Sequence, residues 1–308
     1  MQEPKNADGF QHSNLRVNMA KQVTVNIFDI DWDKKGQAQK FSETLLEFGT
    51  LKLDQRWRDD IRLEFVKEDE ILGFKVIKLD FVKKREVGPG RMANASPIQG
   101  VQMGRDENFG EETAALYVPK KQWLLVLHNQ SGVGPTRITS YCNAIDPGNS
   151  ERHFNYKATA KLDAEAMKKL KSMNGIRSIS VTATMDALTE AEREAGTSLA
   201  AASRPAKPAR INFELHANPS HKRGKFLAFP VAMNLINGLR RRGEDVTRLQ
   251  VTGESDEIGG KDMMIDLLHH KIKRKFSESE LSVVDHRYTR QSRLELLDRA
   301  FRGWHKSL

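Results

Sequence analysis

The chain of 308 residues contains a single cysteine, Cys142, and aromatic residues make up only 7% of it. One cysteine excludes an internal disulfide framework and a zinc site built from several cysteines, and it favours a reducing compartment. The sequence has no run of about 18 uncharged apolar residues, so we expect no membrane-spanning helix. The first twenty residues lack the apolar stretch of a secretory signal peptide. We therefore expect a cytoplasmic protein.

The sequence also lacks the motifs of common enzyme classes. Gly259-Gly260-Lys261-Asp262 has neither the upstream glycine nor the hydroxyl of a phosphate-binding P-loop, and no serine lies in a G-x-S-x-G elbow. The histidines do not have zinc-ligand spacing. Cys142 falls on the apolar face of a predicted helix, which indicates a core position rather than a nucleophile. We expect a protein without enzymatic activity, metal or cofactor.

Two carboxylates come closest to nuclease chemistry. Asp80 precedes Lys83, and Glu64 precedes Lys67, by three residues in each case. Clustered carboxylates near a lysine can hold the Mg²⁺ of a nuclease. Both lie on predicted amphipathic strands, where solvated charge is the commoner explanation. A metal-dependent nuclease or nucleotide-processing enzyme is therefore kept as an alternative function.

Positive charge is present in excess and is unevenly distributed. The formal net charge is +9, and the isoelectric point is near 9.5. Residues 203–308 hold 21 basic and 13 acidic side chains, a net charge of +8, whereas residues 1–202 have a net charge of +1. This asymmetry indicates a polyanionic partner, of which nucleic acid is the commonest. A scaffold that binds an acidic protein is a further alternative.

The pattern of elements predicts an α+β fold with mixed or antiparallel sheets, because strands and helices alternate without an internal repeat. Strands are expected at 23–28, 61–66, 74–82, 113–118, 123–127, 156–162, 178–184, 211–216 and 248–252, and helices at 36–48, 136–145, 163–173, 187–202, 231–241 and 287–304. The segment 263–268 and then a basic segment precede the last helix. Glu68-Asp69-Glu70 is expected to join the strands 61–66 and 74–82, Asp163 to be a helix N-cap, and Asn174-Gly175 to stop that helix. Residues 203–208 (SRPAKP) read as a linker between an N-terminal domain, 20–202, and a basic C-terminal domain, 209–308. We expect residues 1–19 to form a disordered extension.

The basic residues of the C-terminal part occur in runs interleaved with aromatic residues. Lys and Arg side chains that neutralise phosphates release condensed counterions, which drives binding without reading bases. The sequence contains no helix-turn-helix, zinc-finger or RNA-recognition motif, so we expect binding to be sequence-independent. The residues predicted to bind nucleic acid are Arg241, Arg242, Lys271, Lys273, Arg274 and Lys275, helped by Lys222 and Arg223.

A short glycine-containing loop is a candidate for a backbone-phosphate contact. It follows an apolar strand and opens a predicted helix, where free backbone N–H groups and the helix dipole favour an anion. The candidate residues are Gly132, Gly134 and Thr136. Arg137 stands where the dinucleotide-binding fingerprint has its third glycine. A flexible turn in which Pro135 and Thr136 start the helix is the alternative interpretation.

A resemblance to a known family rests on the order of segments from about residue 105 onward. Its carrying segments are 123–127, Gly134-Pro135-Thr136, 157–162 with the following helix to Gly175, 211–216, 264–268 and the C-terminal helix from Arg287. In this layout the chain resembles the RexA exclusion protein of lambdoid phages and the related Kiwa-type KwaB defence proteins. The resemblance implies a non-enzymatic, dimeric or higher-order protein of antiphage defence. It also implies binding of double-stranded DNA without sequence preference and a membrane-protein partner from a neighbouring gene.

We also expect a two-fold homodimer, because a symmetric pair would double the basic surface that one duplex meets. The apolar stripe Leu294, Leu297, Phe301 and Trp304 on the last predicted helix is a candidate interface. Packing of this stripe into the core of the same chain is the alternative.

Overall fold

The computed structural model confirms the α+β class, with helices packed on antiparallel sheets. It describes residues 21–31, 40–93, 96–105, 107–144, 154–198, 209–218, 226–242, 245–255 and 261–306. The expected extension at 1–19 and the expected linker at 203–208 lie outside these ranges. In the part of the chain that is described, no helix is long and apolar enough to cross a membrane.

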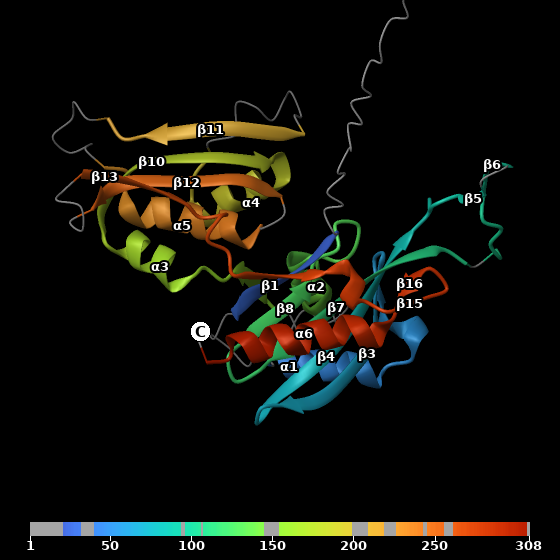
Figure 1. Cartoon of the computed structure of the whole chain (residues 1–308). Helices are drawn as coiled ribbons and strands as arrows, with labels where there is room; N and C mark the ends of the chain where they lie inside the picture. The colour runs from blue at the N-terminus through green and yellow to red at the C-terminus, as the bar shows by residue number, and fades with distance from the viewer. Residues whose placement is uncertain are drawn as a thin grey trace, which may run out of the picture.

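The larger sheet has the strand order β14-β1-β8-β7-β4-β3-β2, and β9 pairs with the same edge of β1 as β14 does. Its strands are β1 (Gln22–Asp31), β2 (Trp57–Arg58), β3 (Ile61–Ile71), β4 (Phe74–Arg85), β7 (Phe109–Val118), β8 (Trp123–Leu127), β9 (Lys157–Ala160) and β14 (Lys273–Ser277). Figure 1 labels strands β1, β8, β7, β4 and β3 of this sheet. Helices α1 (Phe41–Thr50) and α2 (Pro135–Asn143) cover one face, and α6 (Arg290–Trp304) covers the other.

Strand β8 shows why this sheet is buried on both faces. All five of its residues are buried, and they alternate between the two cores. Leu124 and Val126 pack with α1 and α2, whereas Leu125 packs with α6. A strand covered on both sides has a continuous apolar run instead of a polar alternation.

The smaller sheet has the order β11-β10-β12-β13 and carries its helices on one face (Figure 1). Its elements are α3 (Ala164–Lys171), β10 (Met173–Thr184), α4 (Met185–Ala195), β11 (Arg210–His216), α5 (Phe229–Arg241), β12 (Val246–Ser255) and β13 (Lys261–Asp266). Helices α4 and α5 approach closely at Gly238, where an added Cβ would lie 3.0 Å from the Cα of Ala191. Short elements complete the fold: η1 (Leu53–Arg56), the ribbon β5 (Arg91–Ala93) and β6 (Ser96–Gln99), η5 (Glu278–Glu280), and the hairpin β15 (Val283–Val284) and β16 (Arg287–Tyr288).

The sheets divide the chain differently from the predicted domains 20–202 and 209–308. Strand β10 lies before residue 203 but pairs with β11 and β12, which lie after it. Strand β14 and helix α6 return to the larger sheet, where β14 pairs with β1. The elements from α3 to β13 therefore form a unit inserted between β9 and β14. Local composition did not indicate this insertion, because the strands that pair with each other are far apart in sequence.

The two chain segments that enter and leave the inserted unit are bonded to each other. Leu162 forms an antiparallel bridge with Lys271. The N–H of Asp163 donates to the carbonyl of His270 at 3.0 Å. The second carboxylate oxygen of Asp163 lies 2.8 Å from Nδ1 of His270, while its first caps α3 by accepting from the N–H of Ala166 at 2.7 Å. The predicted N-cap is thus confirmed.

Two local predictions from charge and glycine were wrong. The charged residues Glu68, Asp69 and Glu70, predicted to join two strands, continue β3, and the turn follows at Leu72 and Gly73. Both turn residues have positive φ, 54° and 77°, as a tight hairpin turn requires. Asn174-Gly175, predicted to stop a helix, belongs to β10.

Helix α6 begins at Arg290 instead of Arg287, and its apolar stripe is part of the core. Leu294, Leu297 and Phe301 are buried against the larger sheet, and Trp304 is half-buried beside them. The stripe predicted as a candidate dimer interface is therefore occupied by contacts within the chain.

A buried ion pair fastens α6 to the sheet. Asp80 on β4 is fully buried, and its two oxygens accept from the guanidinium of Arg293 at 2.6 and 3.0 Å. Arg290 donates to the same carboxylate at 2.9 Å. Arg293 also lies 3.2 Å from Glu112. Because both oxygens are bound and no side chain of the pair is open to water, Asp80 has a structural role.

We predict that Asp80→Ala lowers the free energy of unfolding by about 3–5 kcal/mol, because it leaves the Arg293 charge buried without its main partner. Urea denaturation measures the change. Asp69→Ala is the control, since Asp69 pairs with Lys78 at 2.8 Å but is 41% exposed, and its loss should cost less than about 1 kcal/mol. Equal effects of the two substitutions would contradict this role.

Candidate anion-binding site

The predicted basic residues of β14 divide between the two faces of the sheet. Lys273 and Lys275 pair with Asn26 and Thr24, whereas Arg274 pairs with Val25 on the α6 side. All three side chains are exposed. The side chains of Lys273 and Lys275 therefore lie on one face of the sheet, and that of Arg274 lies on the other.

Arg274 contacts the end of α6. Its Nη1 donates to the carbonyl of Arg299 at 3.1 Å, and its guanidinium lies 5.3 Å from the centre of the Phe276 ring. Arg299 lies over the same ring at 5.1 Å. Arg274 thus helps to hold α6 on β14.

The other predicted phosphate ligands have different positions. Lys271 lies in the bridge with Leu162, between the inserted unit and β14. Lys222 and Arg223 lie outside the described residues.

The end of α5 lies against the start of α2. The hydroxyl of Thr136 donates to the carbonyl of Arg241 at 2.9 Å. Arg240, the preceding residue, is buried and donates to the carbonyl of Ala160 at 2.9 Å. Burial lowers the pKa of Arg240. Adjacent arginines therefore differ in role, because Arg240 fixes α5 to β9 while Arg241 lines a cavity.

A basic cavity of about 290 Å³ opens where α2, β9, α4 and α5 meet. The cationic side chains that line it are Lys157, Arg193, Arg241 and Arg242. Hydroxyl groups of Thr136, Thr139 and Ser140 line the α2 side. Among the described residues, no acidic side chain lines the cavity. Glu190 lies nearby, where it pairs with Arg242 at 2.5 Å.

A second hollow of about 300 Å³ shares Lys157 and Arg241 with the basic cavity. Its other lining residues are Asn234 and Asn237. These two asparagines and Arg241 are three and four residues apart on α5, so they lie on one helical face. We call this space the asparagine hollow.

Two hydrogen bonds between the side chain of Asn143 and the backbone of Tyr156 hold the wall between α2 and β9. The backbone N–H of Tyr156 donates to Oδ1 of Asn143 at 2.8 Å, and Nδ2 of Asn143 donates to the Tyr156 carbonyl at 3.2 Å. The Tyr156 hydroxyl lies 2.8 Å from the Thr44 hydroxyl. The cavity therefore has a preformed wall, which reduces the cost of ordering on binding.

Close packing accounts for the glycine at position 132 of the loop before α2. A Cβ added at Gly132 would overlap the hydroxyl of Thr113, which accepts a hydrogen bond from the N–H of Val133 at 2.8 Å. Gly134 is the N-cap of α2 with a φ of −75°, a conformation open to any residue. Of the three predicted loop residues, only Thr136 lines the basic cavity.

Sequence reasoning missed two of the four cations. Lys157 stands alone on β9 and Arg193 near the end of α4, so neither is part of a basic run. Arg241 and Arg242 were found because they end a helix in a run of three arginines. The fold alone brings these elements together.

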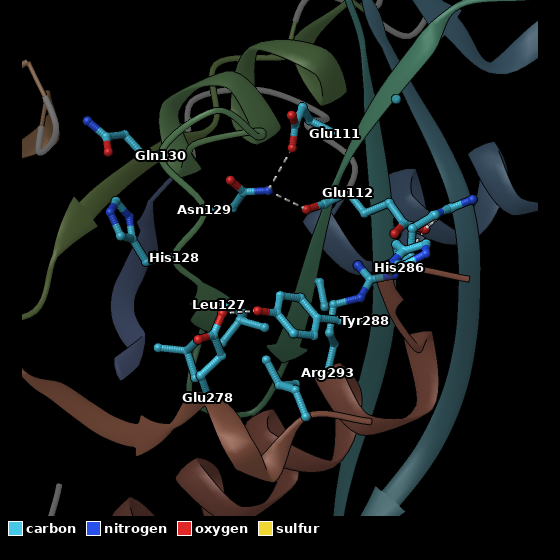
Figure 2. A pocket seen from close by; sticks show the side chains of 15 residues that line it. Glu111, Glu112, Leu127, His128, Asn129, Gln130, Glu278, His286, Tyr288 and Arg293 are labelled. Carbon is cyan, nitrogen blue, oxygen red and sulfur yellow. Dashed lines mark hydrogen bonds and ion pairs between the residues drawn. The ribbon is translucent and has the colours of Figure 1, made fainter. Parts of the chain in front are cut away.

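A larger cavity of about 400 Å³ lies between the ends of β7 and β8 and the β15–β16 hairpin. Figure 2 shows Glu111, Glu112 and Glu278 around it, with Tyr288 and Arg293. Arg293 pairs with Glu112. The hydrogen bond to Glu278 raises the pKa of Tyr288 to about 12. Three carboxylates make this cavity a poor site for an anion.

The carboxylates of the nuclease alternative are bound to arginines. Asp80 is held by Arg290 and Arg293, as described above, and Glu64 pairs with Arg62 at 2.7 Å. Within the described ranges, no group of three or more His, Cys, Asp or Glu side chains is placed to hold a metal ion. Cys142 is buried in the core between α2 and the sheet, and burial raises the pKa of its thiol.

Comparison with known families shows that the chain belongs to DUF6731, a family of unknown function whose model matches residues 20–289. The match extends across the larger sheet and the inserted unit. Among curated proteins, none matches the chain. The resemblance to RexA and KwaB proteins stays a prediction.

We predict that Gly132→Ala lowers the free energy of unfolding by about 1–3 kcal/mol, because the added methyl group forces the Thr113 hydroxyl from its place. Gly100→Ala is the matched control, since a Cβ at Gly100 meets nothing within 4 Å, and its effect should stay within about 0.5 kcal/mol. Thermal or urea denaturation measures both. Wild-type stability of Gly132→Ala would show that the loop does not need glycine for packing.

Proposed function

We propose that this DUF6731 protein binds double-stranded DNA through its phosphates and without sequence preference. The observation that carries the proposal is the basic cavity, where cations from β9, α4 and α5 converge beside the hydroxyls of α2. Cations gathered from separate elements, with no carboxylate among the described residues of the lining, give a positive potential that attracts a polyanion.

Strand β14, on the same edge of β1 as β9, carries a second group of cations, Lys273 and Lys275. Lys157 on β9 pairs with Asp31, and Lys273 on β14 pairs with Asn26. Five residues of β1 separate these positions, which is about 17 Å at the rise of an antiparallel strand. Duplex DNA carries roughly ten phosphate charges over such a length of helix axis. Because five is an odd number, the side chains of Lys157 and Lys273 leave opposite faces of the sheet. A duplex that contacts both groups therefore has to lie across the edge that β9 and β14 form.

The arrangement favours contacts with phosphates over base readout. The cations come from strands β9 and β14 and from the C-terminal ends of α4 and α5. No single helix among the described elements presents all of them on one face that could enter a major groove. Phosphate contacts fix position on a duplex but carry no sequence information.

The setting of the proposed activity comes from the resemblance in segment order. We propose a cytoplasmic protein of antiphage defence that acts as a homodimer, together with a membrane-protein partner from a neighbouring gene. Because the α6 stripe is buried within the chain, a dimer would use another surface.

We predict that DNA affinity falls with salt, with a log–log slope of roughly −4 to −5 if about five phosphates are neutralised. Arg193→Glu and the double variant Lys273→Glu/Lys275→Glu should each weaken binding of two unrelated duplexes equally. The slope should flatten by about one unit per lost contact. Fluorescence anisotropy at several salt concentrations measures both effects.

Lys75→Glu is the matched control for charge. Lys75 is exposed on β4, which β7 and β8 separate from β1, so this substitution should change affinity little. A slope near zero, a strong preference for one duplex, or equal losses for Lys75→Glu and Arg193→Glu would refute the proposal. Displacement of DNA by polyglutamate at equal charge concentration would instead indicate an acidic protein partner.

A further inference from the structure

We infer that the basic cavity and the asparagine hollow together form a site for a nucleoside monophosphate, either at the end of a strand or as a free nucleotide. The phosphate would lie among Lys157, Arg193 and Arg241, and the nucleoside would lie against Asn234 and Asn237. The inference rests on the proposed function in taking phosphate as the anion. Beyond DNA binding, the inference specifies one ligand, a nucleoside monophosphate, and the pocket that holds it.

The concave shape favours a terminal phosphate over an internal one. An internal phosphodiester continues on both sides, so it suits an open surface such as the β14 edge. The cavity is walled by α2, by β9 and by the ends of α4 and α5. A phosphate monoester carries about −1.5 to −2 charges at pH 7, against −1 for a diester. Its higher charge suits a lining with four cationic side chains, of which Arg242 also pairs with Glu190.

Hydrogen-bond donors on the α2 side complement the charge. Thr136 opens the helix, whose N-terminal end carries the positive end of the helix dipole. The Thr136 hydroxyl is fixed by its bond to the Arg241 carbonyl. Ser140 is exposed on the next turn and lines the same cavity. A hydroxyl at this place can donate to a phosphate oxygen.

The asparagine hollow gives the site its second half. Amide side chains present both donors and acceptors, which suit the edges of a base or the hydroxyls of a sugar. Nη1 of Arg240 donates to Oδ1 of Asn237 at 3.2 Å, so this oxygen is fixed and the NH₂ group is turned to other partners. Asn234 is exposed one turn earlier on the same face. Each hollow has a volume near the lower limit of small-ligand pockets, about 300 Å³.

The test is calorimetric titration of the full-length protein with adenosine monophosphate, inorganic phosphate and adenosine. We expect the nucleotide to bind at least about tenfold more tightly than phosphate, and adenosine alone not to bind measurably. Arg193→Ala should weaken both phosphate and nucleotide by a similar factor. Asn234→Ala should remove the advantage of the nucleotide while leaving phosphate affinity unchanged. Lys75→Ala, which alters an exposed cation on β4, should change neither.

Linear duplexes with 5′-phosphate or 5′-hydroxyl ends, and a closed circle of the same sequence, identify the source of the nucleotide. Tighter binding of the 5′-phosphate duplex, abolished by excess adenosine monophosphate, assigns the site to strand ends. Equal binding of all three DNAs, with nucleotide affinity intact, assigns it to free nucleotide. Absence of nucleotide binding, or binding unaffected by Arg193→Ala, overturns the inference. Salt-dependent binding of the closed circle would then still support the proposed function, whereas nucleotide binding without any DNA binding would refute that function alone.

Discussion

The outer edge of β1 is the constraint on which the rest of the structure depends. Strand β8 occupies one edge of β1, and β9 and β14 follow each other along the other. After β9 the chain must leave this edge, and it returns to the edge only at β14. The chain segment between β9 and β14 forms the four-stranded sheet. Its helix α5 is brought back against β9 by the bond from Arg240 to the Ala160 carbonyl, and the basic cavity forms at this contact.

The positive charge of the C-terminal part has two separate uses. Arg240 and Arg293 are buried, and their guanidinium groups join elements that are distant in sequence. Lys273 and Arg193 are exposed and contribute to the surface potential. The net charge of residues 203–308 counts both kinds equally. It therefore indicates a basic protein correctly but does not locate the cations that a ligand can reach.

Sequence reasoning succeeded where the signal is local. The run at 123–127 predicted a buried strand, and Asp163 predicted a helix N-cap, because strand burial and capping depend on adjacent residues. It failed for β14, which was predicted only as a basic segment. Lys273, Arg274 and Lys275 are exposed, so the strand shows one buried apolar residue, Phe276. Its formation depends on pairing with β1, some 250 residues away in sequence. The cavity was only half predictable for the same reason, since Lys157 and Arg193 are isolated cations that tertiary contacts bring together.

The position of the cavity couples binding to the arrangement of the two sheets. Thr136 and Lys157 belong to elements of the larger sheet and its helices, whereas Arg193 and Arg241 belong to the inserted unit. The hydrogen bonds of Arg240 and Thr136 already join the two parts at this contact. A bound phosphate would interact with cations on both sides of it. Because a ligand stabilises the state that binds it, phosphate would hold the inserted unit more firmly on β9.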